Sequence, residues 1–390
     1  LSLISRGDFE LGSFGRLEKE AEIVSTEEGN FTYVLFVNSS NNLNSNSYSI
    51  SHGFVESSFS FVGYLDKVFA QDFNESDYFG RSVSMYGDYV IVGANGDDDI
   101  GIDSGSAYVY KKNSSGQLEF VNKLLASDGA EGRNFGYYRF GSSVSISENY
   151  AIVGATKGSG STYVYKKNSS GQFEFVNQVV PSKPFDNMRF GSSVSISENY
   201  AIVGASNDTN SEGRHVGSVY VYKKNSSGQF EFLSKLSESS LSLDSAFGSS
   251  LDIHDGYLVV GATFDKPSVN RTGSAYVYKN SSEGSFELVN KVVPSKPFDN
   301  MRFGSSVSIF GDYIVVGAKD DVNDRWNVGS AYVYKKNASD QFEFVDRVVA
   351  NDGSPSGLFG SSVSIFNGYV LVGAEAKGAV YVYKKNSSNQ

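Results

Sequence analysis

The residue pattern with the most direct chemical meaning is Asn-x-Ser/Thr, the acceptor sequence for N-linked glycosylation. It recurs at the same place in a repeated stretch, at Asn113, Asn168, Asn225, Asn280, Asn337 and Asn386. Further matches stand at Asn30, Asn38, Asn74, Asn207 and Asn270. A hairpin turn uses the Asn and Gly of Asn-Ser-Ser-Gly but does not need a hydroxyl in the third place. We therefore predict glycosylation of these asparagines, given a eukaryotic secretory route, with plain turn chemistry as the alternative.

A second chemical candidate is an acidic loop, in which Asp97, Asp99 and Asp103 alternate with other residues around Gly101. Hard oxygen ligands at alternate positions of a loop are typical of calcium sites. The loop has no closing bidentate Glu, and the equivalent stretch Thr156–Ser161 lacks the acids. We expect a solvated acidic turn, with calcium as the alternative, and predict no other cofactor.

Two further patterns have weaker chemical meaning. Arg6-Gly7-Asp8 is the tripeptide that integrins bind on their ligands, but a three-residue match occurs easily by chance. Paired tyrosines that could stack on sugars stand at Tyr108/Tyr110, Tyr163/Tyr165, Tyr220/Tyr222 and Tyr332/Tyr334. We expect these rings to pack inside the fold and to direct their hydroxyls toward its rim.

Signals for catalysis are few. The three histidines, His52, His215 and His254, fall at unrelated positions of the repeat. The chain has no cysteine and no Gly-x-Ser-x-Gly nucleophile motif, and its acidic residues are dispersed in loops. We therefore predict that the protein is not an enzyme.

Composition excludes other classes of function. The net charge of −11 argues against nucleic acid as a partner, because phosphate binding needs a basic surface. No apolar run is long enough to span a bilayer, and no secretory signal is visible at Leu1, although a mature chain would have lost it. Without cysteines, stability must come from packing rather than from disulfides.

A repeat must position all these residues. The amino-acid sequence of residues 179–196 is repeated without change at residues 292–309, and a shorter motif recurs more often. It is Phe-Gly followed by small residues, then a valine-rich run that ends in Val-Gly-Ala. The Phe-Gly pairs begin at Phe79, Phe140, Phe190, Phe247, Phe303 and Phe359. Successive Phe-Gly pairs lie 50 to 61 residues apart. Internal repetition at this period indicates a propeller or a solenoid.

One repeat is long enough for four short strands. Within residues 173–228 we predict strands at Phe173–Val176, Gly191–Ile196, Tyr200–Ala205 and Ser218–Tyr222. Four strands per unit is typical of a propeller blade, and a β-solenoid coil would need about half this length. Tyr-Ala-Ile-Val-Gly-Ala is apolar throughout, as expected for a strand that is covered on both faces. The predicted fold class is all-β, a β-propeller of four-stranded blades.

These motifs resemble the FG-GAP repeat family, which includes the integrin α-chain propeller. The resemblance covers about residues 59–390 in six copies: 59–116, 117–171, 172–228, 229–284, 285–340 and 341–390. It is closest to the microbial branch of the family. Calcium-binding integrin blades have an Asp-rich cage between the Phe-Gly strand and the Gly-Ala strand. Here that connection is only Ser-Glu-Asn, Gly-Asp, His-Asp-Gly or Phe-Asn-Gly, so the metal sites of the family do not carry over.

The number of blades depends on residues 1–58, which form either a degenerate first blade or an N-terminal extension with a closing strand. We predict seven blades, with strands at Ala21–Ser25, Phe31–Val37 and Tyr48–Ser51, completed by Phe59–Leu65. Asp8–Leu11 resembles the outer strand Ser285–Leu288 and would complete the last blade. The alternative is six blades closed by Phe59–Leu65, with residues 1–58 as an appendage.

The predicted function is a non-enzymatic, extracellular and glycosylated scaffold or adhesion protein. Its more specific form is the protomer of a surface fibre or array, with a self-closed monomer as the default. The alternative is a lectin-like propeller that binds carbohydrate or another ligand. The predicted partners are proteins or glycans, including self-association by strand addition through residues 8–12. Neither nucleic acid nor a membrane span is predicted.

Overall fold

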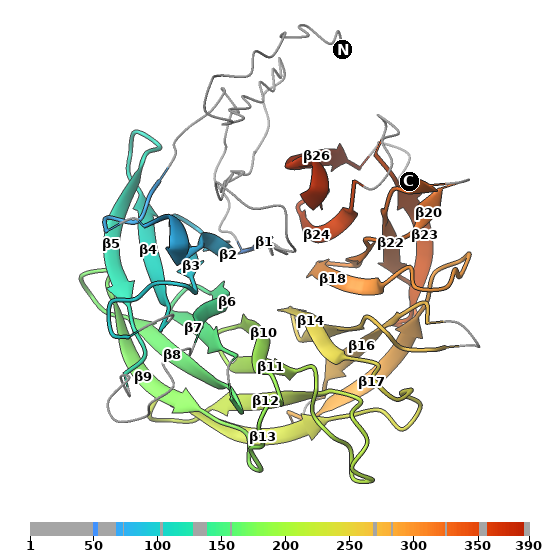
Figure 1. Ribbon diagram of the computed structural model, residues 1–390, viewed down its shortest axis with the longest axis horizontal. Coiled ribbons are helices and arrows are strands. Elements are labelled where there is room, and N and C mark those ends of the chain that lie inside the picture. Colours follow the sequence, from blue (N-terminus) through green and yellow to red (C-terminus); the bar gives the residue numbers. More distant parts are fainter. Residues whose placement is uncertain are drawn as a thin grey trace, which may run out of the picture.

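The computed structural model describes residues 50–53, 68–72, 74–101, 104–127, 139–156, 158–267, 271–281, 284–323, 326–350 and 357–385. Within them the chain forms six β-sheets that surround a common centre as the blades of a propeller (Figure 1). Helical structure in these residues consists of two 3-10 turns, η1 (Glu75–Asp77) and η2 (Glu375–Lys377). The prediction of an all-β propeller with four-stranded blades is confirmed.

The first three blades each contain four antiparallel strands in chain order, from the centre outward. Blade 1 consists of β2 (Phe79–Tyr86), β3 (Tyr89–Ala94), β4 (Ser106–Lys112) and β5 (Leu118–Leu124). Blade 2 consists of β6 (Phe140–Ile146), β7 (Tyr150–Ala155), β8 (Ser161–Lys167) and β9 (Phe173–Val179). Blade 3 consists of β10 (Phe190–Ile196), β11 (Tyr200–Ala205), β12 (Ser218–Lys224) and β13 (Phe230–Leu236).

Blades 4 and 5 repeat this plan, and blade 6 has three described strands. Blade 4 consists of β14 (Phe247–His254), β15 (Tyr257–Ala262), β16 (Ser274–Asn280) and β17 (Phe286–Val292). Blade 5 consists of β18 (Phe303–Phe310), β19 (Tyr313–Ala318), β22 (Ser330–Lys336) and β23 (Phe342–Val348). The loop between β19 and β22 forms a small hairpin of β20 (Val322–Asn323) and β21 (Trp326–Asn327). Blade 6 consists of β24 (Phe359–Phe366), β25 (Tyr369–Ala374) and β26 (Ala379–Lys384).

The sequence repeat and the blade are out of phase. A repeat that starts at Phe173 begins with β9, but β9 pairs with β8 and therefore closes blade 2. Each repeat thus provides the outer strand of one blade and the three inner strands of the next. Because of this offset, each repeat connects two neighbouring blades covalently.

The two glycines of the repeat have different physical roles. Gly141, in Phe-Gly, has a φ of +87° and lies where the register between β6 and β7 shifts, as in a β-bulge. Gly154, in Gly-Ala, allows two blades to approach closely, because a Cβ atom there would lie 2.3 Å from the carbonyl oxygen of Gly191 in blade 3. The Phe of the motif is buried, and Phe140 packs its ring 5.3 Å from the ring of Tyr163. The small and aromatic residues of the motif are therefore required by packing between blades.

The predicted seventh blade is wrong. The remaining strand of the described residues, β1 (Ile50–Gly53), pairs in parallel with β2, with Ile50 opposite Val83 and Gly53 opposite Tyr86. It lies among the inner strands at the centre of the ring (Figure 1), where Tyr48–Ser51 was predicted to be part of a separate blade. A strand pattern specifies which side chains are apolar but not which strand edge they will join. The predicted strands at 8–11, 21–25, 31–37 and 59–65 lie outside the described residues.

Candidate functional site

Four of the predicted glycosylation sites occupy the hairpin between the third and fourth strands of a blade. At Asn168, Oδ1 accepts hydrogen bonds from Ser170 N and Gln172 N, both at 3.0 Å, and Nδ2 donates to the outer-strand Glu174 at 2.6 Å. The same bonds are made by Asn113, Asn225 and Asn337. The Ser170 hydroxyl also donates to Asn168 Oδ1, at 2.7 Å. The turn therefore uses both the Asn and the Ser, and glycosylation stays a prediction.

The other sequons lie in varied surroundings. Asn280 donates to Tyr200 Oη at 3.1 Å, while Ser281 takes the place of Asn at the start of that hairpin. Asn74 caps η1 by accepting from Ser76 N, and Asn207 donates to Asn187 O. Asn30, Asn38, Asn270 and Asn386 lie outside the described residues.

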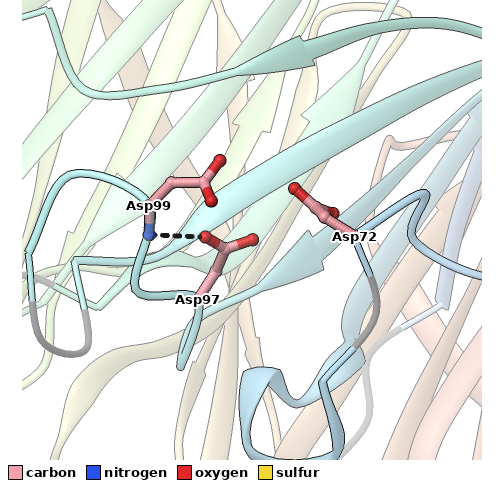
Figure 2. Close-up of side chains that lie close together, drawn as sticks. All are labelled: Asp72, Asp97 and Asp99. Atoms are coloured by element: carbon pink, nitrogen blue, oxygen red, sulfur yellow. Dashed lines mark hydrogen bonds between the residues drawn. The ribbon is translucent and has the colours of Figure 1, made fainter.

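The acidic loop of blade 1 is joined by a residue that the sequence analysis did not connect with it. Carboxylate oxygens of Asp72, Asp97 and Asp99 lie within 4.8 Å of one another. Figure 2 shows the three side chains close together, with Asp99 N donating to Asp97 Oδ1 at 3.0 Å. Asp103, the third residue of the predicted calcium loop, lies outside the described residues. The structure thus brings together two of the three predicted ligands with a new one.

An ammonium group already interacts with these carboxylates. Lys123 Nζ lies 2.6 Å from Asp72 Oδ2 and 2.8 Å from Asp97 Oδ2, and it also contacts Asp99. Burial alone would lower the pKa of Lys123, but hydrogen bonds to the three carboxylates raise it above its usual range. Calcium would have to displace this cation and recruit several further oxygens to reach its usual six to eight ligands. The described residues do not fit a calcium site, and we derive no metal-dependent step from them.

The same buried unit recurs in other blades, which indicates a structural role. The carboxylate of an Asp accepts both from the hydroxyl of a Tyr and from a cation on the outer strand. The units are Asp97–Tyr108–Lys123, Asp208–Tyr220–Lys235, Asp265–Tyr276–Lys291 and Asp321–Tyr332–Arg347. We call this arrangement the Asp–Tyr–cation unit. It could have been found in the sequence, because each Asp stands three residues after a Gly-Ala motif.

Blade 2 shows that the two charges of the unit belong together. Its equivalent loop has no acid, and the cation is replaced by Gln178, whose Nε2 donates to Tyr163 Oη at 3.2 Å. A buried ion that loses its partner is strongly destabilising. The acid and the cation are therefore absent together.

A different set of side chains links the blades around the axis. Serines at one position of the inner strands accept a hydrogen bond from a backbone N–H of the next blade, at 3.1–3.3 Å: Ser84, Ser145, Ser195 and Ser308. Blade 4 has Asp252 at this position. Its Oδ2 accepts from Ile309 N at 3.0 Å and from Ser308 Oγ at 3.1 Å. Because serine makes the same link elsewhere, the carboxylate adds a charge that the link does not require.

Two residues later blade 4 has His254, at a position where the other blades have Tyr86, Ser147, Ser197, Phe310 and Phe366. His254 follows Asp252 on the same face of β14, since side chains alternate along a strand. The His254 ring lies 4.6 Å from the ring of Phe310 at an interplanar angle of 31°, and Phe310 lies 4.6 Å from Phe366. We call Asp252, His254, Phe310 and Phe366 the axial cluster, because β14, β18 and β24 are inner strands around the centre (Figure 1).

Both acidic and basic residues lie at the end of blade 4 that holds His254, since Tyr257 is opposite His254 on one side and opposite Lys279 on the other. Burial raises the pKa of Asp252, although hydrogen bonds from Ile309 and Ser308 and the charge of His254 oppose this shift. His254 Nε2 lies 3.3 Å from Asp255 Oδ2. At the corresponding end of β2, burial raises the pKa of Tyr86, and the charges of Glu148 and Glu198 raise it further. Two ionisable side chains, Asp252 and His254, thus lie on one face of β14.

The remaining candidates lie away from this cluster or outside the described residues. His215 is exposed, and its Nδ1 lies 2.9 Å from Asn207 O. Tyr108, Tyr163, Tyr220 and Tyr332 are buried, as predicted. The side chain of His52, the Arg6-Gly7-Asp8 tripeptide and the predicted strand-addition segment 8–12 are not among the described residues. Within the described part of the chain, no helix has the length and apolar character needed to cross a membrane.

The fold and its motifs define a repeat-built β-propeller. The FG-GAP repeat model matches residues 65–110, 118–165, 173–222, 231–278, 286–334 and 342–383. The chain therefore belongs to the FG-GAP repeat family, and the resemblance stated from the motifs is confirmed. A comparison with curated proteins gave no match.

Two solved structures share the fold. One is the periplasmic gluconolactonase of Pseudomonas aeruginosa, with a TM-score of 0.51 and 16% identity, covering 77% of this chain and 80% of that chain. The other is a protein from Lactobacillus plantarum, with a TM-score of 0.50 and 15% identity, covering 78% of this chain and 80% of that chain. At these identities the likeness establishes the fold alone.

The gluconolactonase nevertheless overturns the prediction of a non-enzymatic scaffold or adhesion protein, with its lectin-like alternative. That prediction, and the prediction that the chain is not an enzyme, treated a propeller without a recurring histidine as inert. The gluconolactonase is an enzyme with a similar propeller architecture. The prediction had weighed catalytic residues only by whether they recur, and it did not consider residues at which a single blade differs from the others.

Proposed function

We propose that this protein is a hydrolase whose active site is the axial cluster. The observation that carries the proposal is Asp252, a carboxylate in a position where serine suffices to link the blades, with His254 two residues away on the same face. A strand rises by about 3.3 Å per residue, so these two side chains start roughly 7 Å apart. Titratable residues that are perturbed by burial and lie beside a second ionisable group are typical of catalytic sites.

The chemistry assigned to the pair is general base catalysis. In the tautomer that we propose, Nε2–H donates to Asp255 Oδ2, 3.3 Å away, and Nδ1 is the nitrogen that accepts a proton. Nδ1 takes a proton from water while the water oxygen attacks the carbonyl carbon of an ester. The C–O bond of the ester then breaks, and the leaving oxygen receives the proton back from His254. The Asp252 carboxylate stabilises the imidazolium that exists between these two transfers.

The substrate that we propose is a lactone, a cyclic ester. The printed activity of the similar propeller from Pseudomonas aeruginosa, a gluconolactonase, supports this choice. Hydrolysis adds one water to the ring and yields a single hydroxy acid, so no second substrate is needed.

The test is hydrolysis of a panel of sugar lactones by the full-length protein, followed with a pH indicator. We expect His254→Gln to lower the rate about 10²- to 10⁴-fold, the usual contribution of a general base. Asp252→Ser restores the residue of the other blades, so it should preserve folding while it lowers the rate. His215→Gln, on an exposed loop, is the matched control and should leave the rate unchanged. A rate no higher than that of buffer, or equal rates for wild type and His254→Gln, would refute the proposal.

We also propose that the protein acts outside the cytoplasm and is glycosylated. The repeated sequons support this, and the periplasmic source of the similar propeller is compatible with it. Intact-mass analysis of native material before and after glycosidase treatment tests it. Unmodified asparagines throughout would contradict glycosylation and remove the argument for a eukaryotic secretory route.

A further inference from the structure

We infer that Tyr313, Lys335 and Lys385 form a binding site for a small free carboxylate at the interface between blades 5 and 6. The observation that carries the inference is a comparison within the chain. At the interface between blades 4 and 5, a tyrosine and two lysines in the same positions hold a carboxylate that belongs to the chain itself. The inference is independent of the proposed function.

The site that already holds a carboxylate is centred on Tyr257, and we call it the Tyr257 site. Asp340, from the outer hairpin of blade 5, accepts through Oδ1 from the Tyr257 hydroxyl at 2.9 Å. Its Oδ2 pairs with Lys279, which stands opposite Tyr257 on the neighbouring strand. Lys336 Nζ lies 4.5 Å from the centre of the Tyr257 ring. One phenol and two ammonium groups thus surround a carboxylate, a group that accepts hydrogen bonds and donates none.

The same arrangement recurs one interface further on, around Tyr313, and we call it the Tyr313 site. Tyr313 stands opposite Lys335. Lys335 Nζ and Lys385 Nζ lie 5.6 and 4.8 Å from the centre of the Tyr313 ring, and the corresponding distances at the Tyr257 site are 5.5 and 4.5 Å. The Tyr313 hydroxyl oxygen is buried and has no hydrogen-bond partner among the described residues. Burial alone would raise the pKa of Tyr313, but Lys385 and Lys335 lower it below its usual value.

The two sites differ in their acids. Asp340 corresponds in sequence to Asn389, which lies outside the described residues. Asp312, which pairs with a lysine of the Tyr257 site at 2.9 Å, corresponds to Gly368. Both acids of the Tyr257 site therefore have neutral counterparts at the Tyr313 site, although the lysines are retained.

One acid remains close to the Tyr313 site. Glu343 stands opposite Lys335 on β23, and it accepts a hydrogen bond from Asn337 Nδ2 at 2.7 Å. Neither Lys335 nor Lys385 takes part in an ion pair within the described part of the chain. Two ammonium groups beside one acid leave a positive charge that an anion can balance. A carboxylate suits the site because its two oxygens accept from the hydroxyl and from an ammonium group together, as those of Asp340 do.

The ligand reaches the site from solvent. Lys385 is exposed and Lys335 is half-buried, and lysine side chains are flexible enough to move aside without a change in the strands. Acetate has the heavy atoms of an aspartate side chain beyond its Cα, so it reproduces the group that the Tyr257 site holds. The ligand class is therefore small aliphatic carboxylates, and acetate is the probe.

An acetate titration of the full-length protein with ¹³C-labelled tyrosine rings tests the inference by NMR. Sodium acetate replaces sodium chloride at constant ionic strength, because screening by salt affects all exposed charges. The variants Tyr313→Phe and Tyr257→Phe identify the two signals. We expect the Tyr313 signal to shift in a saturable way. The Tyr257 signal should stay in place, because Asp340 already occupies its site.

Two lysine variants test the role of the charge. Lys385→Gln should weaken acetate binding at Tyr313 about tenfold, because hydrogen bonds from charged donors are stronger than those from neutral donors. Lys384→Gln is the matched control. Lys384 is exposed and lies over the ring of Tyr369, so its replacement should leave the response of Tyr313 unchanged.

Two exchanges between the sites test the comparison itself. Asp340→Asn removes the internal carboxylate and should make the Tyr257 signal respond to acetate; Asn also tolerates the φ of +63° at this position. Asn389→Asp supplies an internal carboxylate in the other hairpin and should abolish the response of Tyr313.

The result that would overturn the inference is a Tyr313 signal that acetate does not shift in a saturable way. A shift that Lys385→Gln leaves unchanged, or an equal shift of Tyr257 in the wild type, would also overturn it. None of these measurements involves lactone hydrolysis, so failure of the proposed function and failure of this inference are separate results.

Discussion

Replacing Asp265 by Ala tests whether the Asp–Tyr–cation unit stabilises a blade through its buried charge. Asp265 is fully buried, and its Oδ2 accepts from Lys291 Nζ at 2.7 Å, Ser274 Oγ at 2.8 Å and Tyr276 Oη at 3.0 Å. Ala leaves these three donors without their acceptor. Breaking a buried ion pair by removal of one partner costs about 3–5 kcal/mol. We expect Asp265→Ala to lower the free energy of unfolding by that amount.

Blade 2 suggests the compensating change, because it pairs its tyrosine with Gln178 instead of an acid and a cation. Lys291→Gln in the Asp265→Ala background removes the unpaired ammonium and imitates that arrangement. We expect it to restore about 1–3 kcal/mol, the usual cost of leaving a buried polar group unsatisfied. Urea titrations of the four proteins of the cycle, followed by circular dichroism, measure the coupling between the two positions.

The sign of the pH dependence gives a second measurement on the same proteins. Burial alone would raise the pKa of Asp265, but hydrogen bonds from Lys291 and Ser274 hold it below its ordinary value of 3.8. A carboxyl with a lowered folded-state pKa stabilises the fold above the unfolded-state pKa, and this stability is lost as the pH falls through the folded-state value. Wild type should therefore lose more stability than Asp265→Ala below pH 3.8. A change of less than about 0.5 kcal/mol in Asp265→Ala, or strictly additive costs in the cycle, would refute the reasoning.

Two further predictions concern the repeat glycine and the turn before blade 1. Gly204→Ala should abolish soluble folding or lower the free energy of unfolding by more than about 3 kcal/mol, because its Cβ would lie 2.2 Å from Gly248 O. The control Gly213→Ala, with no atom within 4 Å of its Cβ, should cost about 1 kcal/mol. Thermal melts compare the two variants, and equal costs would contradict this explanation. Asp77 has its pKa raised to about 6 by burial, against a hydrogen bond from Asn74 N and with a further rise from Asp97. Because the folded state binds the proton on Asp77 more tightly than the unfolded state, wild type should lose up to about 3 kcal/mol of stability as the pH rises from 4 to 7. Asp77→Asn should remove this loss, and denaturant titrations at each pH measure it.

The strands could be predicted from the sequence because each motif residue satisfies a local requirement. Tyr200–Ala205 was predicted with the bounds that β11 has, since an apolar run flanked by turn residues fits a strand covered on both faces. The number of blades could not be predicted in this way. The pairing of Ile50–Gly53 with the inner edge of β2 depends on which edge is available in the assembled ring. That information is absent from the residues of the strand itself.

The candidate site was missed for a different reason. The search weighed histidines by whether they recurred, and His254 does not. An alignment of the inner strands would have shown Phe-Gly-Ser-Ser-Leu-Asp-Ile-His in blade 4 against Phe-Gly-Ser-Ser-Val-Ser-Ile-Phe in blades 5 and 6. What the sequence could not supply is the contact of Asp252 with Ser195 and Ser308, because these serines come from the two neighbouring blades.

In a propeller made of near-identical blades, residues that the fold requires recur from blade to blade, whereas a residue with a separate function can occur in one blade. A residue that blades 1 to 5 need, such as the Gly of Gly-Ala, recurs because each of these five interfaces presents the same steric limit. A residue that occurs once has no such explanation, and burying a carboxylate has a free-energy cost that serine avoids. Asp252 stands where the other five inner strands have Ser, and burial raises the pKa of its carboxyl. The departure from the repeat at Asp252 is therefore what supports placing the proposed hydrolytic site there.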